Sequence, residues 1–144
     1  MKRTKTVIFT FLIMTVFIGA FVSNAMAQEE AAAPSKLVVL WTSGDPDVAN
    51  GIAFMYAHNA KRVGWFDEVT LIVWGPSQRL LVGDKDLQKE VKAMLDDGIT
   101  VEACVACAMN FGIVDELKSL GITVKPMGVP LTDYLKGDCK VLTF

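Results

Sequence analysis

The sequence predicts an α/β fold, a three-layer α/β/α sandwich around a mostly parallel five-stranded sheet. Short continuous apolar segments, typical of strands that are covered on both faces, recur along the chain. They alternate with amphipathic segments of helical period, and this alternation is typical of parallel α/β domains. The tetrapeptide Gly-Ile-Thr-Val occurs twice, at 98–101 and 121–124, each time where a helix is expected to end and a strand to begin.

The first strand and helix are expected between residues 36 and 64. The segment 36–42 (KLVVLWT) is a continuous apolar strand. Ser43 or Asp45 can cap the following helix, Pro46 suits its first turn, and Gly64 is placed to end it. The residues expected on the buried face of this helix are Val48, Ala49, Ile52, Ala53, Met55, Ala60 and Val63.

The rest of the chain repeats this alternation. Four more strands are expected, at 68–74, 99–103, 122–126 and 140–144. Three helices are expected at 77–82, 110–120 and 130–136. A fourth helix, capped by Asp84 or Asp86, ends at Gly98 and carries an apolar face of Leu87, Val91, Met94 and Leu95. Five strands separated by helices complete the predicted sandwich.

The first 27 residues have the three parts of a secretory signal peptide. Lys2, Arg3 and Lys5 form a positive start, an apolar run follows, and Ala25-Met26-Ala27 places small residues before a predicted cleavage site after Ala27. The apolar run of about 16 residues is short for a membrane span. A retained anchor is the alternative interpretation.

Cleavage after Ala27 divides the chain into three parts. Residues 1–27 are the signal peptide, 28–35 a flexible lead-in, and 36–144 a single domain. The protein is then expected to be periplasmic or secreted, with no stable membrane insertion after cleavage.

The charge of the exported part argues against nucleic acid as a partner. The whole chain has a net charge of −2, but without the three basic residues of the signal it has 11 basic and 16 acidic side chains, a net charge of −5. Phosphate binding requires clustered lysine and arginine, and no such run is present. A hydrophobic fraction of 52% also excludes a disordered chain.

The candidate catalytic residues are Cys104 and Cys107. Sites in parallel sheets gather beyond the carboxyl ends of the strands, and Cys104-Val105-Ala106-Cys107 directly follows the third strand and opens a helix. Unpaired N–H groups at a helix start favour a thiolate, which is the attacking species. The two-residue spacing allows one sulfur to attack and the other to resolve the product. An inert pair buried in the core is the alternative.

The third cysteine and the single histidine are expected to lie apart from this pair. Cys139 opens the last strand at the amino edge of the sheet, and a five-residue strand spans about 16 Å, while a disulfide needs Cα atoms within about 7 Å. The same separation argues against a zinc site formed by Cys104, Cys107, Cys139 and His58. No metal site is predicted. Neither a P-loop nor a dinucleotide-binding glycine pattern is present, so no cofactor is predicted.

Two other groups of residues are expected to be structural. Three tryptophans that flank strands are expected in the core or in subunit contacts: Trp41, Trp65 and Trp74. Two pairs of aspartates are expected to be helix caps and not metal ligands: Asp45/Asp47 and Asp84/Asp86.

Four segments together resemble the DsrE/DsrF-like sulfur-relay family over residues 36–144. They are KLVVLWTSGDP at 36–46, VEACVACAMNFGI at 101–113, LGITVKPMG at 120–128 and DCKVLTF at 138–144. The resemblance implies a three-layer α/β/α domain that assembles into dimers, trimers or hexamers. It also implies that Cys104 carries sulfane sulfur as a persulfide and that Cys107 assists or resolves.

The chain departs from this family at two points. Members often carry a basic residue just before the glycine that follows the cysteine loop, where this chain has Phe111 before Gly112. The best-understood relay members work in the cytoplasm, whereas this chain begins with an export signal.

Three functions follow from these observations. The first is an exported sulfur-handling protein, a sulfurtransferase or a carrier, that exchanges sulfur with a donor or acceptor protein or a small sulfur compound. The second is a thiol–disulfide oxidoreductase that uses the same pair. The third is a non-catalytic homo-oligomeric binding module with buried cysteines.

Overall fold

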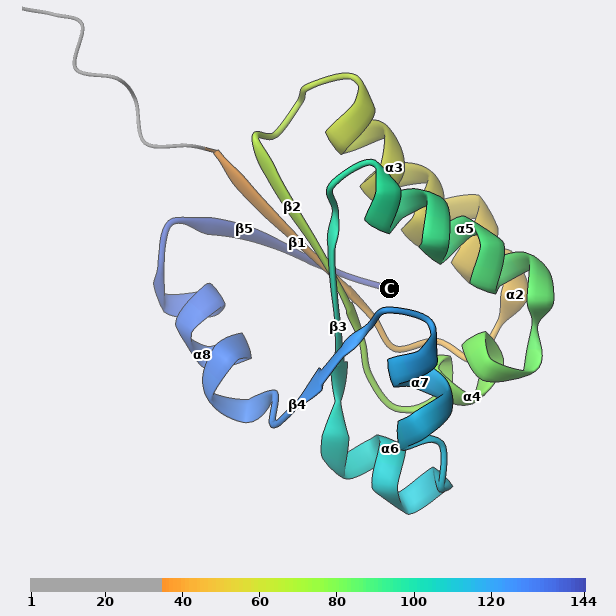
Figure 1. Cartoon of the computed structure of the whole chain (residues 1–144). Coiled ribbons are helices and arrows are strands. Elements are labelled where there is room, and N and C mark those ends of the chain that lie inside the picture. The colour runs from red at the N-terminus through yellow and green to blue at the C-terminus, as the bar shows by residue number, and fades with distance from the viewer. Residues whose placement is uncertain (1–34) are drawn as a thin grey trace, which may run out of the picture. The chain divides into compact units, whose positions relative to one another are not determined.

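The computed structural model describes residues 35–144, which fold around one five-stranded sheet (Figure 1). The strands lie in the order β4-β3-β2-β1-β5, and every pairing is parallel. Their bounds are Lys36–Trp41 (β1), Glu68–Val73 (β2), Thr100–Cys104 (β3), Thr123–Lys125 (β4) and Cys139–Thr143 (β5). The predicted signal peptide and all of the lead-in except Ser35 lie outside the described residues.

Helices cover both faces of the sheet. Their bounds are Pro46–Val48 (α2), Ala49–Phe54 (η1, a π-helix), Met55–Arg62 (α3), Pro76–Gly83 (α4), Lys85–Asp96 (α5), Val105–Phe111 (α6), Val114–Ser119 (α7) and Gly128–Lys136 (α8). In Figure 1, α3 and α5 lie on one side of the sheet and α8 lies on the other. The predicted three-layer α/β/α sandwich is confirmed, and the sheet is parallel throughout.

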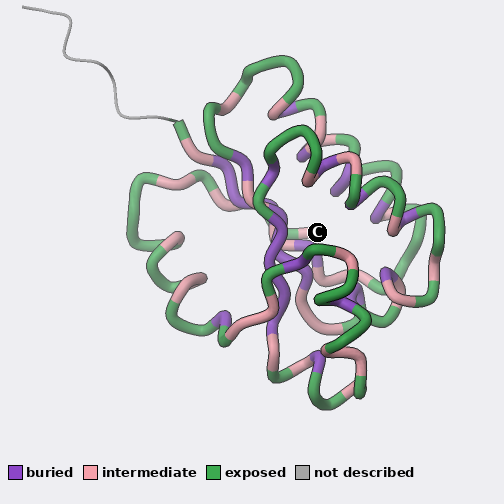
Figure 2. Tube along the Cα trace, in the orientation of Figure 1, coloured by how far each residue is buried: buried purple, intermediate pink, exposed green. Residues whose placement is uncertain are grey.

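Successive residues of the strands divide between two apolar cores, because side chains alternate between the faces of a sheet. The larger core includes Leu37, Val39 and Trp41 of β1 together with buried residues of the helices on the α3/α5 side. The smaller core, on the α8 side, consists of the buried residues Val38, Ile72, Cys104 and Met127 with partly buried neighbours. Figure 2 shows the buried strands at the centre and the mostly exposed outer turns of the helices. No residue within α8 itself is fully buried, so the α8 side of the sheet is the less covered side.

The first helix differs from the prediction because part of it is a π-helix. Ile52, Met55 and Val63 were expected to face the core, and all three are exposed. A π-helix takes an extra residue per hydrogen-bonded turn, so the side chains that follow are rotated relative to an α-helix. The buried face consists instead of Ala49, Ala53, Phe54, Ala57 and Ala60.

The helix expected at 110–120 is two helices, with a break after the cysteine segment. Gly112 adopts φ +69°, a left-handed conformation that favours glycine, and ends α6. The next helix, α7, starts at Val114. The expectation of one continuous helix was therefore wrong, because Gly112 acts as a helix end. As a result, α6 is a short helix that begins immediately after Cys104.

Candidate functional site

The structure places the two candidate cysteines next to each other at the carboxyl edge of the sheet. Cys104 is the last residue of β3 and the N-cap of α6, and it is 5% exposed. Cys107 lies one turn later in α6 and is partly exposed. Figure 1 shows β3 passing directly into α6 at this edge. Both side chains contact the smaller core, and both are free thiols.

The surroundings of Cys107 keep it in the thiol form. Burial is the largest influence and raises the pKa of Cys107 above its ordinary value. The neighbouring Cys104 raises this pKa further, both as a hydrogen-bond partner and through its negative charge when ionised. Hydrogen bonds from the Gly75 backbone and the Trp74 side chain act in the opposite direction. Cys107 is therefore a protonated neighbour that can donate a hydrogen bond to the sulfur of Cys104.

We expect Cys107 to react with iodoacetamide only at a higher pH in the folded protein than in the urea-unfolded chain. Alkylation requires the thiolate, and a raised pKa moves thiolate formation to higher pH. In Cys104→Ser the contributions of Cys104 disappear, so the midpoint should fall but stay above that of the unfolded chain. Peptide mass spectrometry across a pH series measures both midpoints. Equal midpoints in folded and unfolded protein would contradict this assignment.

The first turn of α4 holds the ends of three strands together. The fully buried side chain of Gln78 donates hydrogen bonds from Nε2 to the carbonyl oxygens of Val73 and Cys104, each at 3.0 Å. Ser77 is also fully buried, and its Oγ donates to the carbonyl of Trp41 at 2.7 Å. These bonds fix the backbone at Cys104 relative to β1 and β2. The sequence places both residues in a loop at the correct edge but gives no sign of these partners.

A cation from a neighbouring helix lies over Phe111, the residue just before Gly112. The guanidinium of Arg79, on α4, lies over the ring of Phe111 at 4.7 Å from the ring centroid. Phe111 follows Cys107 by four residues in α6 and so lies on the same side of that helix. Arg79 therefore brings a positive charge next to position 111, which itself carries none. The sequence could not reveal this, because the two residues belong to different elements.

An ion pair of one buried and one partly exposed residue lies beside Cys104 on the α8 side of the sheet. The side chain of Glu102 is 6% exposed, and its Oε1 accepts a hydrogen bond from Nζ of Lys125 at 2.7 Å. Among the described residues, its second oxygen has no hydrogen-bond partner. Neither residue was predicted from the sequence, although a glutamate inside an apolar strand is an unusual feature.

Cys139 lies at the opposite end of the sheet from the candidate pair. In the parallel register it is opposite Lys36, the first residue of β1, whereas Cys104 is the last residue of β3. Cys139 is a free thiol that contacts the same apolar core from the amino edge. The structure does not bring it to Cys104 and Cys107 as a partner.

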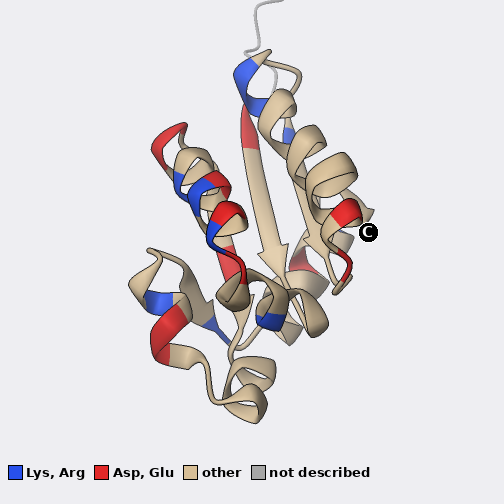
Figure 3. Cartoon of the chain, turned by 90° about the vertical axis from the view of Figure 1, so that its right-hand side faces the viewer, with Lys and Arg blue, Asp and Glu red and all other residues tan. Residues whose placement is uncertain are grey.

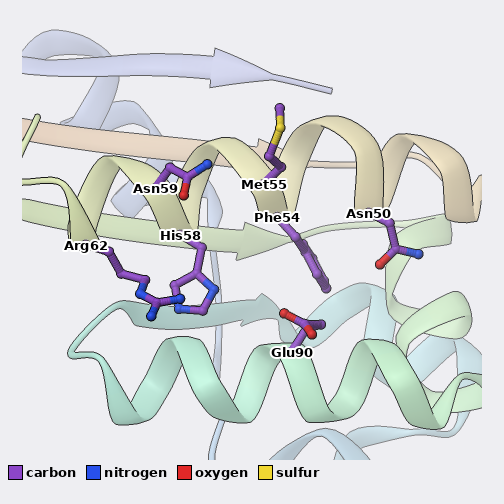
Figure 4. A pocket seen from close by; sticks show the side chains of 7 residues that line it. All are labelled: Asn50, Phe54, Met55, His58, Asn59, Arg62 and Glu90. Carbon is purple, nitrogen blue, oxygen red and sulfur yellow. The ribbon is translucent and has the colours of Figure 1, made fainter.

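His58 belongs to a separate polar pocket on the α3/α5 side. Its Nε2 lies 2.6 Å from a carboxylate oxygen of Asp97. The pocket, of about 330 Å³, is lined by residues of η1, α3 and α5: Asn50, Phe54, Met55, His58, Asn59, Arg62 and Glu90 (Figure 4). Within residues 35–144, no three histidine, cysteine, aspartate or glutamate side chains are grouped so that they could hold a metal ion.

The aspartates and tryptophans expected to be structural can now be placed. Asp45 caps α2 by accepting from the Asp47 backbone, and Asp84 caps α5 by accepting from two backbone N–H groups. Trp41 is fully buried, Trp74 is partly buried beside the cysteines, and Trp65 is half exposed. The predicted helix caps are confirmed at Asp45 and Asp84.

The surface of the α3/α5 layer carries mixed charges. Acidic and basic residues are interspersed along α5, as the ribbon colours of Figure 3 show. Two of them, Asp86 and Lys89, form an exposed ion pair of 2.7 Å. Across residues 35–144, no helix is long and apolar enough to cross a bilayer.

Comparisons with known proteins identify relatives of the whole described domain. The family model of the DsrE/DsrF-like family matches residues 35–144. Among solved structures, a conserved protein of unknown function from Bacteroides thetaiotaomicron is 44% identical, with a TM-score of 0.74 over 76% of this chain and 95% of that one. The ychN protein from E. coli is 14% identical, with a TM-score of 0.58 over 78% of this chain and 100% of that one, and is similar in fold. No curated protein matches significantly.

Proposed function

The chain belongs to the DsrE/DsrF-like family, and from this premise we propose that it binds or transfers sulfane sulfur as a persulfide on Cys104, with Cys107 assisting or resolving. The observation that carries the proposal is the arrangement of the two sulfurs. Cys104 ends β3 at the carboxyl edge, and Cys107 is held beside it as a thiol. A family of sulfur-relay type makes a sulfur species the natural reactant of such a pair.

The proposed loading step is a thiolate attack on a polysulfide. The Cys104 thiolate forms a bond to a sulfane sulfur, the adjacent S–S bond of the polysulfide breaks, and the shortened polysulfide leaves with the electron pair. The Cys107 thiol can donate a hydrogen bond to the Cys104 sulfur during this exchange. For transfer, the thiolate of an acceptor attacks the outer sulfur, and Cys104 leaves as a thiolate.

Cys107 offers a second way to discharge the persulfide. Its thiolate attacks Sγ of Cys104, a Cys104–Cys107 disulfide forms, and hydrosulfide leaves with the electron pair. A dithiol reductant must then reduce the disulfide before another cycle. The raised pKa of Cys107 slows this route at neutral pH and so favours carriage over release.

We further propose that this chemistry takes place outside the cytoplasm, in the periplasm or in the secreted protein. The support is the N-terminal signal sequence with its cleavage site after Ala27. The proposed partners are a donor or acceptor protein or a small sulfur compound, and further copies of the same chain. The less covered α8 side, with partly buried Leu40, Leu131 and Val141, supports a contact between copies.

The experiment is intact-mass measurement after treatment of the purified protein with inorganic polysulfide. We expect a mass increase of one or more sulfur atoms in the wild type and in Cys139→Ser, and none in Cys104→Ser. Cys107→Ser should keep the adduct but release less hydrosulfide. An unmodified wild-type protein, or an adduct that persists in Cys104→Ser, would overturn the proposal.

Thiol–disulfide exchange is a second candidate, favoured by the proximity of Cys104 and Cys107. The same pair could alternate between a dithiol and a disulfide. Catalysis of insulin reduction, measured in parallel with polysulfide loading, separates the two functions. Insulin reduction without a sulfur adduct would favour exchange.

A further inference from the structure

Three side chains near the candidate site share one face of the sheet. Glu102 and Cys104 are two residues apart in β3, so both point to the side that α8 covers. Lys125 of β4 is the register partner of Cys104 in β3. Its side chain therefore points to the same face of the sheet and is the cross-strand neighbour of Cys104. Lys125 and Cys104 are therefore cross-strand neighbours on one face at the carboxyl edge.

Only one of the two carboxylate oxygens of Glu102 accepts a hydrogen bond within residues 35–144. Lys125 Nζ reaches back along the sheet to Oε1 of Glu102 at 2.7 Å, while the second carboxylate oxygen has no partner within residues 35–144. Lys125 is 34% exposed and Glu102 is 6% exposed, so the flexible, partly solvated lysine is the member that can move. A buried carboxylate is costly unless it is paired. Glu102 therefore anchors Lys125 beside Cys104.

We propose that the ammonium group of Lys125 stabilises the negative charge on the Cys104 sulfur, whether thiolate or persulfide. Glu102 is the positioning residue that holds Lys125 in place. The persulfide part of this inference rests on the proposed function. The ligand class is an anionic sulfane-sulfur species. No covalent bond forms to Lys125. Its ammonium group stabilises the charge on the sulfur through space, while Glu102 Oε1 holds it at 2.7 Å.

The other ionisable groups near Cys104 do not supply this cation. Cys107 faces it from α6, and Tyr134 of α8 and Cys139 of β5 belong to the same cluster, but none of the three carries a positive charge in any protonation state. The pKa of Tyr134 is raised by burial and then by the charge of Glu102, which keeps this phenol neutral. Arg79 is exposed and lies over Phe111. Lys36, on the same face, is bound to Glu68 at the amino edge.

The test is the pH midpoint of Cys104 alkylation by iodoacetamide, followed by peptide mass spectrometry. A cation favours the thiolate, so Lys125→Met should raise the midpoint by about 0.5–1 pH unit, while Lys125→Arg should stay close to the wild type. Removing the opposing carboxylate with Glu102→Gln should lower the midpoint. Lys118→Met, which removes an exposed lysine of α7, is the matched control and should change nothing.

The opposite signs separate an electrostatic role from a structural one. Loss of structure alone would move Lys125→Met and Glu102→Gln in the same direction. Lys125→Met leaves the buried Glu102 without its partner and is the variant at risk of misfolding. Two other variants avoid this risk: Glu102→Gln alone, and the double variant that combines Lys125→Met with Glu102→Gln. The double variant should have a midpoint between those of the two single variants.

The outcome also separates this inference from the proposed function. A sulfur adduct on the wild-type protein, with midpoints that do not differ among the variants, would overturn the role of Lys125 and leave the function intact. Opposite shifts without any adduct from polysulfide would support the cation beside Cys104 and overturn the sulfur function.

Discussion

Replacement of Gln78 by leucine is expected to destabilise the domain by about 2–4 kcal/mol and to speed up alkylation of Cys104 in the folded protein. The substitution removes the Nε2 donor that now binds the carbonyl oxygens of both Val73 and Cys104. A buried acceptor without its donor costs roughly 1–3 kcal/mol. Because one of these carbonyls belongs to Cys104, the junction of β3 and α6 should also loosen around a side chain that is only 5% exposed.

Gln88 provides a matched control for this prediction. Its Nε2 also donates to two carbonyl oxygens, those of Leu81 and Val82, but the residue is only partly buried. Water can replace the lost bonds there, so Gln88→Leu should cost less than about 1 kcal/mol and leave the Cys104 rate unchanged. Urea unfolding and iodoacetamide kinetics measure the two effects. Equal losses of stability in both variants would contradict the role given to Gln78.

Replacement of Trp41 by alanine is expected to cost about 3–5 kcal/mol of unfolding free energy, because it empties the largest buried side chain of the core. Trp41 also makes an edge-to-face contact with Phe54, with ring centroids 4.9 Å apart. Trp65 is the control: it is half exposed, and its ring centroid lies 5.8 Å from that of Tyr56. Trp65→Ala should cost less than about 1 kcal/mol by urea unfolding. A small loss for Trp41→Ala would show that the core can collapse onto the cavity.

The sequence predicted the architecture well, because strands covered on both faces and regular helices have strong periodic patterns. Leu87, Val91 and Met94 of α5 are buried as their spacing predicted. The π-helix was not predictable in this way, because periodicity analysis assumes an α-helical turn, and the error moved Ile52 and Met55 to the wrong face. A single glycine, Gly112, likewise divided one expected helix into two.

The candidate site was only partly predictable for a different reason. Cys104 and Cys107 were found because they are close in sequence and chemically distinctive. Gln78, Arg79 and Lys125 reach the site from other elements, through a hydrogen bond to β3, a contact with Phe111 and the register of β4. Such contacts depend on how strands and helices pack against one another, and local sequence patterns do not reveal that packing.

The thin cover over Cys104 has a consequence for the time that sulfur could stay on the protein. Met127, the N-cap of α8, closes the smaller core next to Cys104, yet no residue within α8 is fully buried. A helix held by so few buried side chains is expected to open locally at a lower free energy than the strands beneath it. We therefore expect an external acceptor to reach a sulfur atom on Cys104 mainly when α8 opens, so that local opening of this helix would add to the raised pKa of Cys107 in prolonging the time that sulfur stays bound.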